Sequence, residues 1–311
     1  MRFRADVTPA AYTGYMDMPE PDTAVASALD LGAAIDAAVC AAHAGAAVLQ
    51  SYAHHRADLV IDRKARNDLV SQADREAEAA IIEILRERTP GFGLIAEETG
   101  GRAEGPATWY IDPLDGTTNF LHGLPHYAVS IALVAHTGTP LVAGQPVAED
   151  TPAVGVVYDP NREELFTAVH GIGAWVNGRR IACSRTQGLE DAVLATGFPM
   201  RDLSIADEYM PMLHAAVYST RGVRRAGSAA LDLAWTACGR YDGYWELGLA
   251  PWDVAAGTLL VREAGGVAAA LRGDAPWPSG GDVVAGNPDI ARALREMIAP
   301  HLTDRRAPRA G

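Results

Sequence analysis

The chain has 311 residues, of which 49% are hydrophobic and 21% charged, an ordinary balance for a globular protein with a substantial core. Its net charge of -13 argues against a general nucleic-acid binder, which would carry a basic stripe. The three cysteines lie far apart without a CxxC pair, and the N-terminus lacks the apolar segment of a signal peptide. With no run of about 18 apolar residues either, the sequence predicts a cytoplasmic protein that does not span a membrane.

The first half of the chain predicts helices packed on a largely antiparallel sheet. Residues 1–26 form a flexible extension, residues 27–52 an alanine-rich helix and residues 74–88 a second helix with an apolar stripe. Short β-branched and aromatic runs follow, with a strong hairpin signal at Asn177 and Gly178. Residues 137–153 form a long polar connection between two of these strands.

In the second half, strands and helices alternate. Strands are expected at 192–198, 241–247 and 281–287, and helices at 206–218, 228–239 and 253–266. Such alternation predicts a sheet packed between helices. We therefore expect an α/β protein with an α+β N-terminal lobe (27–188), an α/β C-terminal lobe (189–301) and a tail (302–311).

Acidic side chains gather where the predicted elements begin or end: Asp74, Glu97, Glu98, Asp112, Asp115 and Asp253. Each of them, taken alone, fits a helix cap or a solvated turn. Together they would repel one another unless a cation neutralised them. Oxygen ligands favour Mg²⁺, whereas the His-rich and Cys-rich spacings of zinc sites are missing.

The stretch IDPLDGTTNF, residues 111–120, places two of these aspartates directly before Gly116 and Thr117. A helix that opens there would direct free N–H groups at a phosphate, and cations beside a phosphate site suggest phosphoryl chemistry. The Asp-x-x-Asp-Gly spacing differs from an EF-hand loop and from the Asp-x-Asp-Gly-Thr motif of the haloacid-dehalogenase phosphatases. The sequence also lacks the motifs of P-loop proteins, serine hydrolases and zinc proteases.

The motifs AEE, DPLDGTTNF and PWDVAAG occur in an order and spacing that resemble the inositol monophosphatase family, part of a lithium-sensitive, Mg²⁺-dependent phosphatase superfamily. The resemblance runs from about residue 27 to residue 300. It implies a layered αβαβα sugar-phosphatase fold and hydrolysis of a phosphomonoester by metal-activated water, without a covalent phospho-enzyme. It also implies two to three Mg²⁺ ions per active site and a homodimer.

The resemblance implies two sets of metal ligands. Glu97, Asp112 and the carbonyl of Leu114 match the ligands of the first ion. Asp112, Asp115 and Asp253 match those of the second, and Glu97 would reach a third, weaker ion through water. All of these donors are oxygens, as Mg²⁺ requires.

The remaining roles follow from the same resemblance. Thr117, hydrogen-bonded to Asp74, matches the pair that helps Glu97 activate the attacking water. The amides of Gly116 and Thr117 would hold the phosphate. The segment that approaches the alcohol matches Gly227, Ser228 and Ala229, and Glu246 lies seven residues before Asp253, the spacing of the family's hydroxyl-binding glutamate.

These roles favour inositol 1-phosphate or a related small polyol phosphate as the substrate. Histidinol phosphate, fructose 1,6-bisphosphate and 3′-phosphoadenosine 5′-phosphate remain alternatives on the same scaffold. A function of a different class is a regulatory partner of the transcription machinery, as in some bacterial relatives; direct nucleic-acid binding is not expected. Either Arg63 or Lys64 matches the family's loop lysine, and His122 and His126 are interpreted as structural residues.

Overall fold

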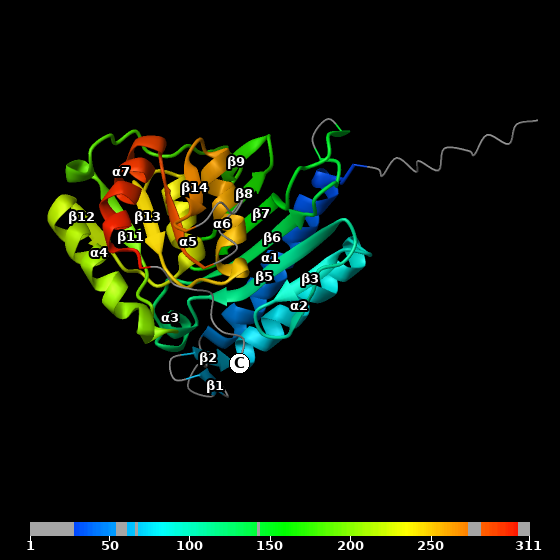
Figure 1. Cartoon of the computed structure of the whole chain (residues 1–311). Helices are drawn as coiled ribbons and strands as arrows, with labels where there is room; N and C mark the ends of the chain where they lie inside the picture. The colour runs from blue at the N-terminus through cyan, green and yellow to red at the C-terminus, as the bar shows by residue number, and fades with distance from the viewer. Residues whose placement is uncertain (1–27, 54–60, 66–67, 142–143, 273–280, 304–311) are drawn as a thin grey trace, which may run out of the picture.

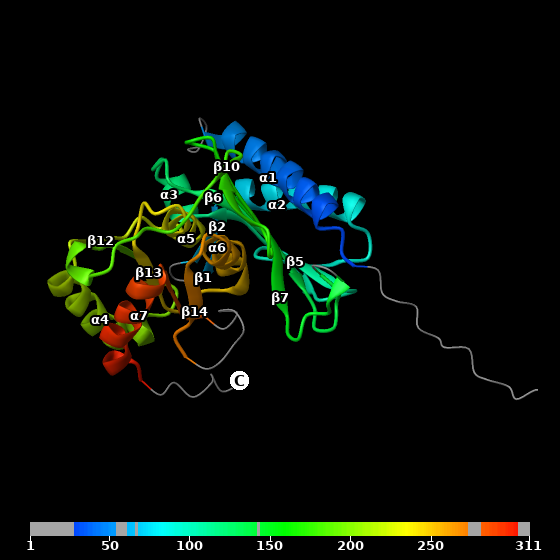
Figure 2. The ribbon, with the colours of Figure 1, turned by 90° about the horizontal axis from the view of Figure 1, so that it is seen from above.

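The computed structural model describes residues 28–53, 61–65, 68–141, 144–272 and 281–303 (Figure 1). The extension expected at residues 1–26 and the end of the expected tail, from residue 304, lie outside this range. The described residues form five alternating layers of helices and sheets (Figures 1 and 2). The α/β fold expected from the sequence is confirmed.

The first layer contains α1 (Leu31–Ala53) and α2 (Gln72–Arg88), which pack on one face of the larger sheet (Figure 2). The larger sheet contains, in spatial order, β10 (Arg179–Arg180), β9 (Gly173–Val176), β8 (Glu164–Val169), β7 (Thr151–Asp159), β6 (Ala128–Ala135), β5 (Ala107–Asp115), β3 (Gly93–Ala96) and β4 (Gly100–Arg102). Neighbouring strands run antiparallel except β3 and β5, so the predicted antiparallel sheet is confirmed with one parallel pair.

The third layer contains α5 (Ala229–Ala237) and α6 (Pro251–Glu263), which lie between the two sheets (Figure 2). The smaller sheet has the order β12 (Gly222–Arg224), β11 (Val193–Thr196), β13 (Gly243–Glu246), β15 (Val283–Gly286) and β14 (Val267–Ala270). Its outer face is covered by α4 (Ala206–Ser219) and α7 (Pro288–Ile298). A hairpin of β1 (Ile61–Ala65) and β2 (Asp68–Ser71) precedes α2, and α3 (Thr117–Leu121) follows β5.

Helix α1 is built mainly of alanine, which is a strong helix former and lets the helix lie close to its neighbours. Its inner alanines are buried against α2, β6 and β7. By length and composition alone, α1 is the one helix among the described residues that is apolar enough to cross a membrane. The absence of a membrane span therefore stays a prediction.

Three large apolar clusters among the described residues hold the layers together. One lies between α1, α2 and the larger sheet, and a second joins the larger sheet through α5 and α6 to the smaller sheet. A third lies between the smaller sheet and the outer helices α4 and α7. Because the second cluster contains residues from both halves of the chain, the division into lobes at residues 188 and 189 stays a proposal. It coincides with the passage from β10 to β11.

Some of the elements expected from the sequence are confirmed and others differ. The hairpin at Asn177 and Gly178 is confirmed as the turn between β9 and β10. The connection expected at 137–153 is shorter, because β7 begins at Thr151 and a bridge joins Pro140 to Pro146. The sequence analysis did not predict α7, although an N-cap residue followed by proline precedes its apolar stripe.

Candidate active site

The end of strand β5 brings Asp112 and Asp115 to one edge of the larger sheet. Between these residues the pairing with β6 shifts by one residue, and the intervening segment contains Pro113, which has no N–H to donate. The N–H of Leu114 turns back to donate to Asp112 Oδ1 at 3.0 Å. This bulge allows two aspartates three residues apart to line the same cavity.

The turn after β5 contacts helix α2 through the side chain of Thr117. Gly116 has a φ of 102°, a left-handed conformation that suits glycine, and α3 starts at the next residue. The hydroxyl of Thr117 lies 3.2 Å from Asp74 Oδ1 and 3.2 Å from the Leu114 carbonyl, two acceptors between which its proton is shared. Asp74 is buried in the first turn of α2, where the N–H of Ser71 donates to it.

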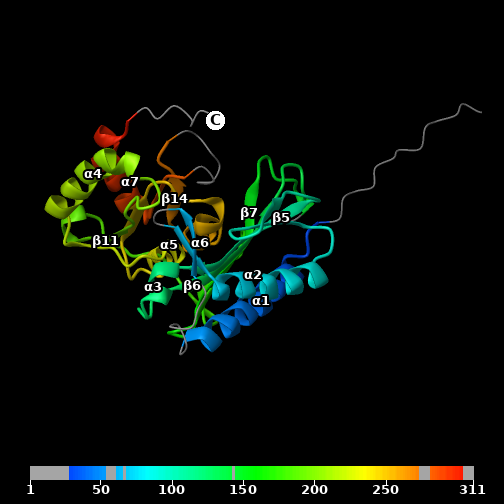
Figure 3. The same ribbon diagram turned by 90° about the horizontal axis from the view of Figure 1, so that it is seen from below.

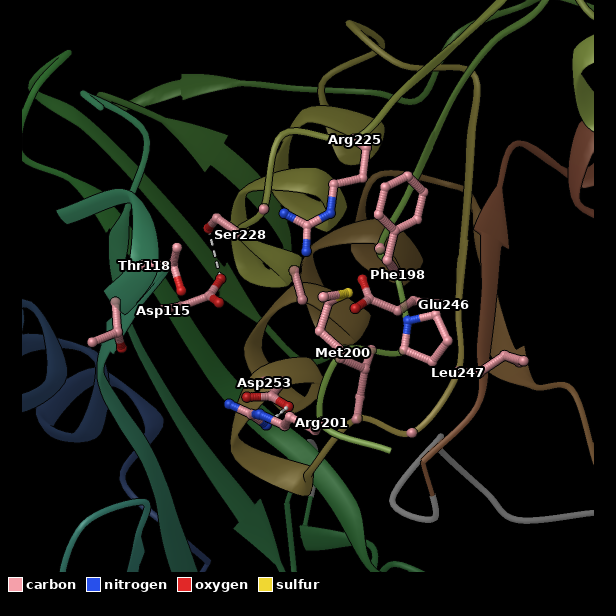
Figure 4. Close-up of a pocket in the computed structure, with 18 of the residues that line it drawn as sticks. Asp115, Thr118, Phe198, Met200, Arg201, Arg225, Ser228, Glu246, Leu247 and Asp253 are labelled. Atoms are coloured by element: carbon pink, nitrogen blue, oxygen red, sulfur yellow. Dashed lines mark hydrogen bonds and ion pairs between the residues drawn. The ribbon is translucent and has the colours of Figure 1, made fainter. Parts of the chain in front are cut away.

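Asp115 reaches across to the N-terminus of helix α5, 113 residues later in the chain. The hydroxyl of Ser228 donates to Asp115 Oδ2 at 2.6 Å (Figure 4), and the N–H of Ala230 donates to the same oxygen at 2.7 Å. The side-chain amide of Asn119 donates to the carbonyl of Ala226 at 2.9 Å. These bonds hold the 226–228 segment beside α3, as Figure 3 shows.

Asp253 and Glu97 complete the acidic edge from two other elements. Asp253 lies in the first turn of α6, where the N–H of Ala250 donates to its Oδ2 at 2.7 Å. Glu97 follows β3, and its N–H donates to the carbonyl of Ile111 on β5. The buried carboxylate of Glu78 accepts bonds from the next two amides, at 2.8 and 2.9 Å, and so fixes this turn.

Burial and mutual repulsion disfavour the charged forms of these carboxylates. Burial, followed by the charges of Glu97, Asp115 and Asp253, raises the pKa of Asp112 well above its ordinary range. Burial and the charge of Asp253 raise the pKa of Asp115 to about 6, and burial also raises the pKa of Asp74. A bound cation would reverse this penalty by favouring the ionised forms.

A cavity of about 720 Å³ connects the acidic edge to the smaller sheet. Its lining includes most of the residues that the sequence analysis singled out: Asp112, Leu114, Asp115, Gly116, Thr117, Gly227, Ser228, Ala229, Glu246 and Asp253. Asp74 and Glu97 are not part of this lining, but Asp74 contacts the cavity residue Thr117 and Glu97 contacts the cavity residue Arg201.

Glu246 closes the cavity on the side of the smaller sheet (Figure 4). The hydroxyl of Tyr244 donates to Glu246 Oε2 at 2.6 Å, and burial raises the pKa of Glu246 to about 7. A carboxylate in this position accepts hydrogen bonds when it is ionised.

The donor set fits Mg²⁺ chemically, because four carboxylates and one carbonyl offer only oxygen. The side chains do not converge as they stand: within the described ranges, no three His, Cys, Asp or Glu side chains lie close enough to hold one ion. Instead, the guanidinium of Arg201 lies between two of the carboxylates, 3.2 Å from Glu97 Oε1 and 3.2 Å from Asp253 Oδ2.

Sequence reasoning missed several residues of this site. Arg201, Phe198 and Met200 come from the loop after β11, which no motif marks, and Arg225 lies over the ring of Phe198 at 5.2 Å. The need for a counter-charge beside four carboxylates is a signal that could have pointed to Arg201, but the sequence analysis assigned that charge to Mg²⁺ alone. Glu78 carried no signal beyond its place on α2.

The sequence analysis also singled out two histidines and the basic pair before β2. His126 packs edge-on against Trp235, and burial lowers its pKa to about 4, so it is neutral and fits the structural interpretation. His122 is exposed at the end of α3. The side chains of Arg63 and Lys64 lie outside the described part of the structure, so the choice between them stays open.

Comparison with known sequences identifies the family. A sequence model of the inositol monophosphatase family matches residues 30–307. The chain belongs to the inositol monophosphatase family. The resemblance seen in the three acidic motifs is thereby confirmed, and this family is generally Mg²⁺-dependent.

Some relatives of this chain are named as Nus factors and others as inositol monophosphatases. Nus factor SuhB of Pseudomonas aeruginosa is 46% identical over 254 residues, which cover 79% of this chain and 89% of the relative. An inositol-1-monophosphatase of Synechocystis sp. is 45% identical over 242 residues, 77% of this chain and 80% of the relative. Among solved structures, the extragenic suppressor protein suhB from Bartonella henselae matches with a TM-score of 0.78 and 39% identity, over 86% of this chain and 98% of that chain.

Proposed function

We propose that this chain is a Mg²⁺-dependent phosphomonoesterase that hydrolyses inositol 1-phosphate or a related small polyol phosphate. Family membership supports a phosphatase, and the inositol-1-monophosphatase among its relatives supports the substrate class. The observation that carries the proposal is a single cavity. Its lining brings together Asp112, Asp115 and Asp253, the turn at Gly116, and Glu246.

Two to three Mg²⁺ ions would be held by the carboxylates of Glu97, Asp112, Asp115 and Asp253 and by the carbonyl of Leu114. When bound, Mg²⁺ makes water a stronger nucleophile and neutralises the charge of the phosphate. The donors from α5 both bind Asp115 Oδ2, so they fix this carboxylate at the cavity wall before any ligand arrives. Such fixed ligands need little reorganisation during the reaction.

Thr117 and Asp74 would position the attacking water. The Thr117 hydroxyl donates its proton toward Asp74 and the Leu114 carbonyl, which leaves its oxygen lone pairs to accept a hydrogen bond from water. Asp74 is itself held by Ser71, so the hydroxyl keeps one orientation. The amides of Gly116 and Thr117 would bind the phosphate oxygens.

Glu246 would select the alcohol by accepting hydrogen bonds from its hydroxyl groups. At neutral pH a group with a pKa of about 7 is roughly half ionised, and the ionised form is the better acceptor. A carboxylate also attracts an amine, so histidinol phosphate is the nearest alternative. Fructose 1,6-bisphosphate and 3′-phosphoadenosine 5′-phosphate complete the panel of alternatives.

The test is phosphate release from these four substrates, with and without Mg²⁺, by the wild type and by Asp112→Asn. We expect Mg²⁺-dependent release that is fastest with inositol 1-phosphate, is inhibited by Li⁺ and is lost in the variant. A higher kcat/KM for histidinol phosphate would refute the substrate class. No release from any substrate would refute the phosphatase itself.

The cellular setting is proposed on the same basis. Relatives of both names come from bacteria, and we infer a cytoplasmic enzyme that acts on a soluble phosphomonoester. A homodimer is inferred from the family resemblance alone. Sedimentation of the purified chain would test it, with a single species of twice the 32.8 kDa chain mass as the expected result.

A second candidate function is a regulatory partner of the transcription machinery. It is favoured by the name Nus factor SuhB, carried by the 46% identical relative. The test is binding of purified wild-type and Asp112→Asn protein to purified bacterial RNA polymerase. Binding by both proteins would support this function as independent of the phosphatase site, and binding by neither would refute it.

A further inference from the structure

The loop between β11 and α4 carries a positive charge into the acidic edge. Arg201 lies on this loop, and its two terminal nitrogens contact different carboxylates, Glu97 Oε1 and Asp253 Oδ2, each at 3.2 Å. Figure 4 shows Arg201 beside Asp253. Glu97 follows a strand of the larger sheet, whereas Asp253 opens a helix of the middle layer. One side chain therefore joins two layers across the cavity.

The burial of the three side chains is unequal. The side chains of Glu97 and Asp253 are 10% and 3% exposed, whereas the Arg201 side chain is 46% exposed. Buried carboxylates need a counter-charge because the lost contact with water is otherwise uncompensated. The Arg201 side chain therefore has access to solvent, whereas the two carboxylates have almost none.

The charge of Arg201 neutralises part of the negative charge at the acidic edge. Its guanidinium contacts two carboxylates that are almost fully buried, Glu97 and Asp253. The guanidinium therefore stabilises the ionised carboxylates as a divalent cation would, but it carries a single charge spread over a planar group. The same guanidinium lies between Glu97, a proposed ligand of the first ion, and Asp253, a proposed ligand of the second.

We propose that Arg201 is a built-in cation that occupies part of the Mg²⁺ site and competes with the metal for Glu97 and Asp253. The inference rests on the metal ligands of the proposed function. Binding of Mg²⁺ then requires the Arg201 side chain to leave both carboxylates, and its half-exposed position gives it a path into solvent. The loop 197–205 thus couples metal loading to the conformation of the cavity wall.

The experiment measures Mg²⁺ binding to the metal-free protein by titration calorimetry, without substrate. Arg201→Met keeps the unbranched stem of the side chain and removes its charge, so we expect it to bind Mg²⁺ at least about fivefold more tightly than the wild type. Arg201→Lys, with a single point charge, should fall between them. The matched control is Arg225→Met, which removes a cavity arginine that packs over Phe198, and it should change the affinity by less than about twofold.

A second readout separates competition from damage to the fold. Without metal, Arg201→Met leaves buried carboxylates uncompensated, so its unfolding midpoint should fall by about 2 to 4 °C. In saturating Mg²⁺ the midpoint should equal that of the wild type. Two changes of this kind, tighter binding and a lower metal-free midpoint, are not expected of a residue that only supports the loop.

The outcomes are distinct. Equal or weaker Mg²⁺ binding by Arg201→Met would overturn the competition, and so would an equal gain in the Arg225→Met control. In both cases wild-type metal binding, and with it the proposed function, would stand. If neither the wild type nor Arg201→Met binds Mg²⁺ at millimolar concentrations, the metal site of the proposed function fails and the competition fails with it.

Discussion

The position of Gly197 predicts that Gly197→Ala will weaken substrate binding through Glu246. A Cβ atom at residue 197 would lie 1.9 Å from Glu246 Oε1 and 2.0 Å from its Cδ, far closer than any real contact. Because the carboxylate is the far end of a flexible side chain, we expect it to rotate out of the cavity while the backbone stays in place.

The size of the effect follows from what this rotation breaks. Glu246 accepts a 2.6 Å hydrogen bond from Tyr244, whose side chain is fully buried. A hydrogen bond to a charged group contributes about 1.5 to 3 kcal/mol, and a similar loss applies to hydrogen bonds from the substrate. We therefore expect KM for inositol 1-phosphate to rise about 10- to 100-fold, with a change in kcat of less than about threefold.

The assay is steady-state phosphate release by the wild type, Gly197→Ala, Glu246→Ala and the double variant. If the added methyl group acts only through Glu246, the double variant will match Glu246→Ala, because the carboxylate it displaces is already missing. An unchanged KM in Gly197→Ala would refute the reasoning. A further loss in the double variant would show that the methyl group distorts the loop itself.

Three further predictions concern stability. Because burial raises the pKa of Glu246 from 4.5 to about 7, the stability from its protonated form is fully present below pH 4.5 and is lost as the pH rises through 7. Urea unfolding of the wild type and Glu246→Gln from pH 4 to 8 should therefore diverge by up to about 3 kcal/mol, and parallel curves would contradict this. Ser228→Ala removes both the donor to Asp115 and the N-cap of α5. The free energy of unfolding, measured in EDTA, should therefore fall by about 2 to 3 kcal/mol. A loss below about 0.5 kcal/mol would contradict the geometry. Asn287→Ala removes the N-cap of α7, far from the cavity lining, and should lower the free energy of unfolding by about 1 to 2 kcal/mol with no change in phosphate release per folded molecule.

Local signals in the sequence determined much of the fold. Asn177 and Gly178 both take positive φ values in the hairpin, as the Asn-Gly pair predicts. The spacing in IDPLDGTTNF specified a turn that places two aspartates and Gly116 at one strand end, because turn chemistry depends on neighbouring residues only. Helix α7 carried a comparable local signal at Asn287, and the sequence analysis overlooked it.

The sequence also indicated the chemistry of the site, but not its assembly. Carboxylates at the ends of separate elements suggested a cation site, since charge of one sign needs compensation wherever it gathers. Which element lies beside which depends on the order of strands in the two sheets and on α5 and α6 packing between them. No pattern within a few residues records that order.

Contacts between distant segments were therefore decided by the tertiary structure alone. Packing of the middle layer brings Ser228 to Asp115 across 113 residues of chain. The smaller sheet brings Gly197 against Glu246, and the loop after β11 brings Arg201 between two carboxylates of other layers. The sequence by itself determined the acidic motifs and their turns, because these depend on neighbouring residues. The residues that contact those motifs from other layers are set by the burial of apolar surface between the layers, which only the folded chain specifies.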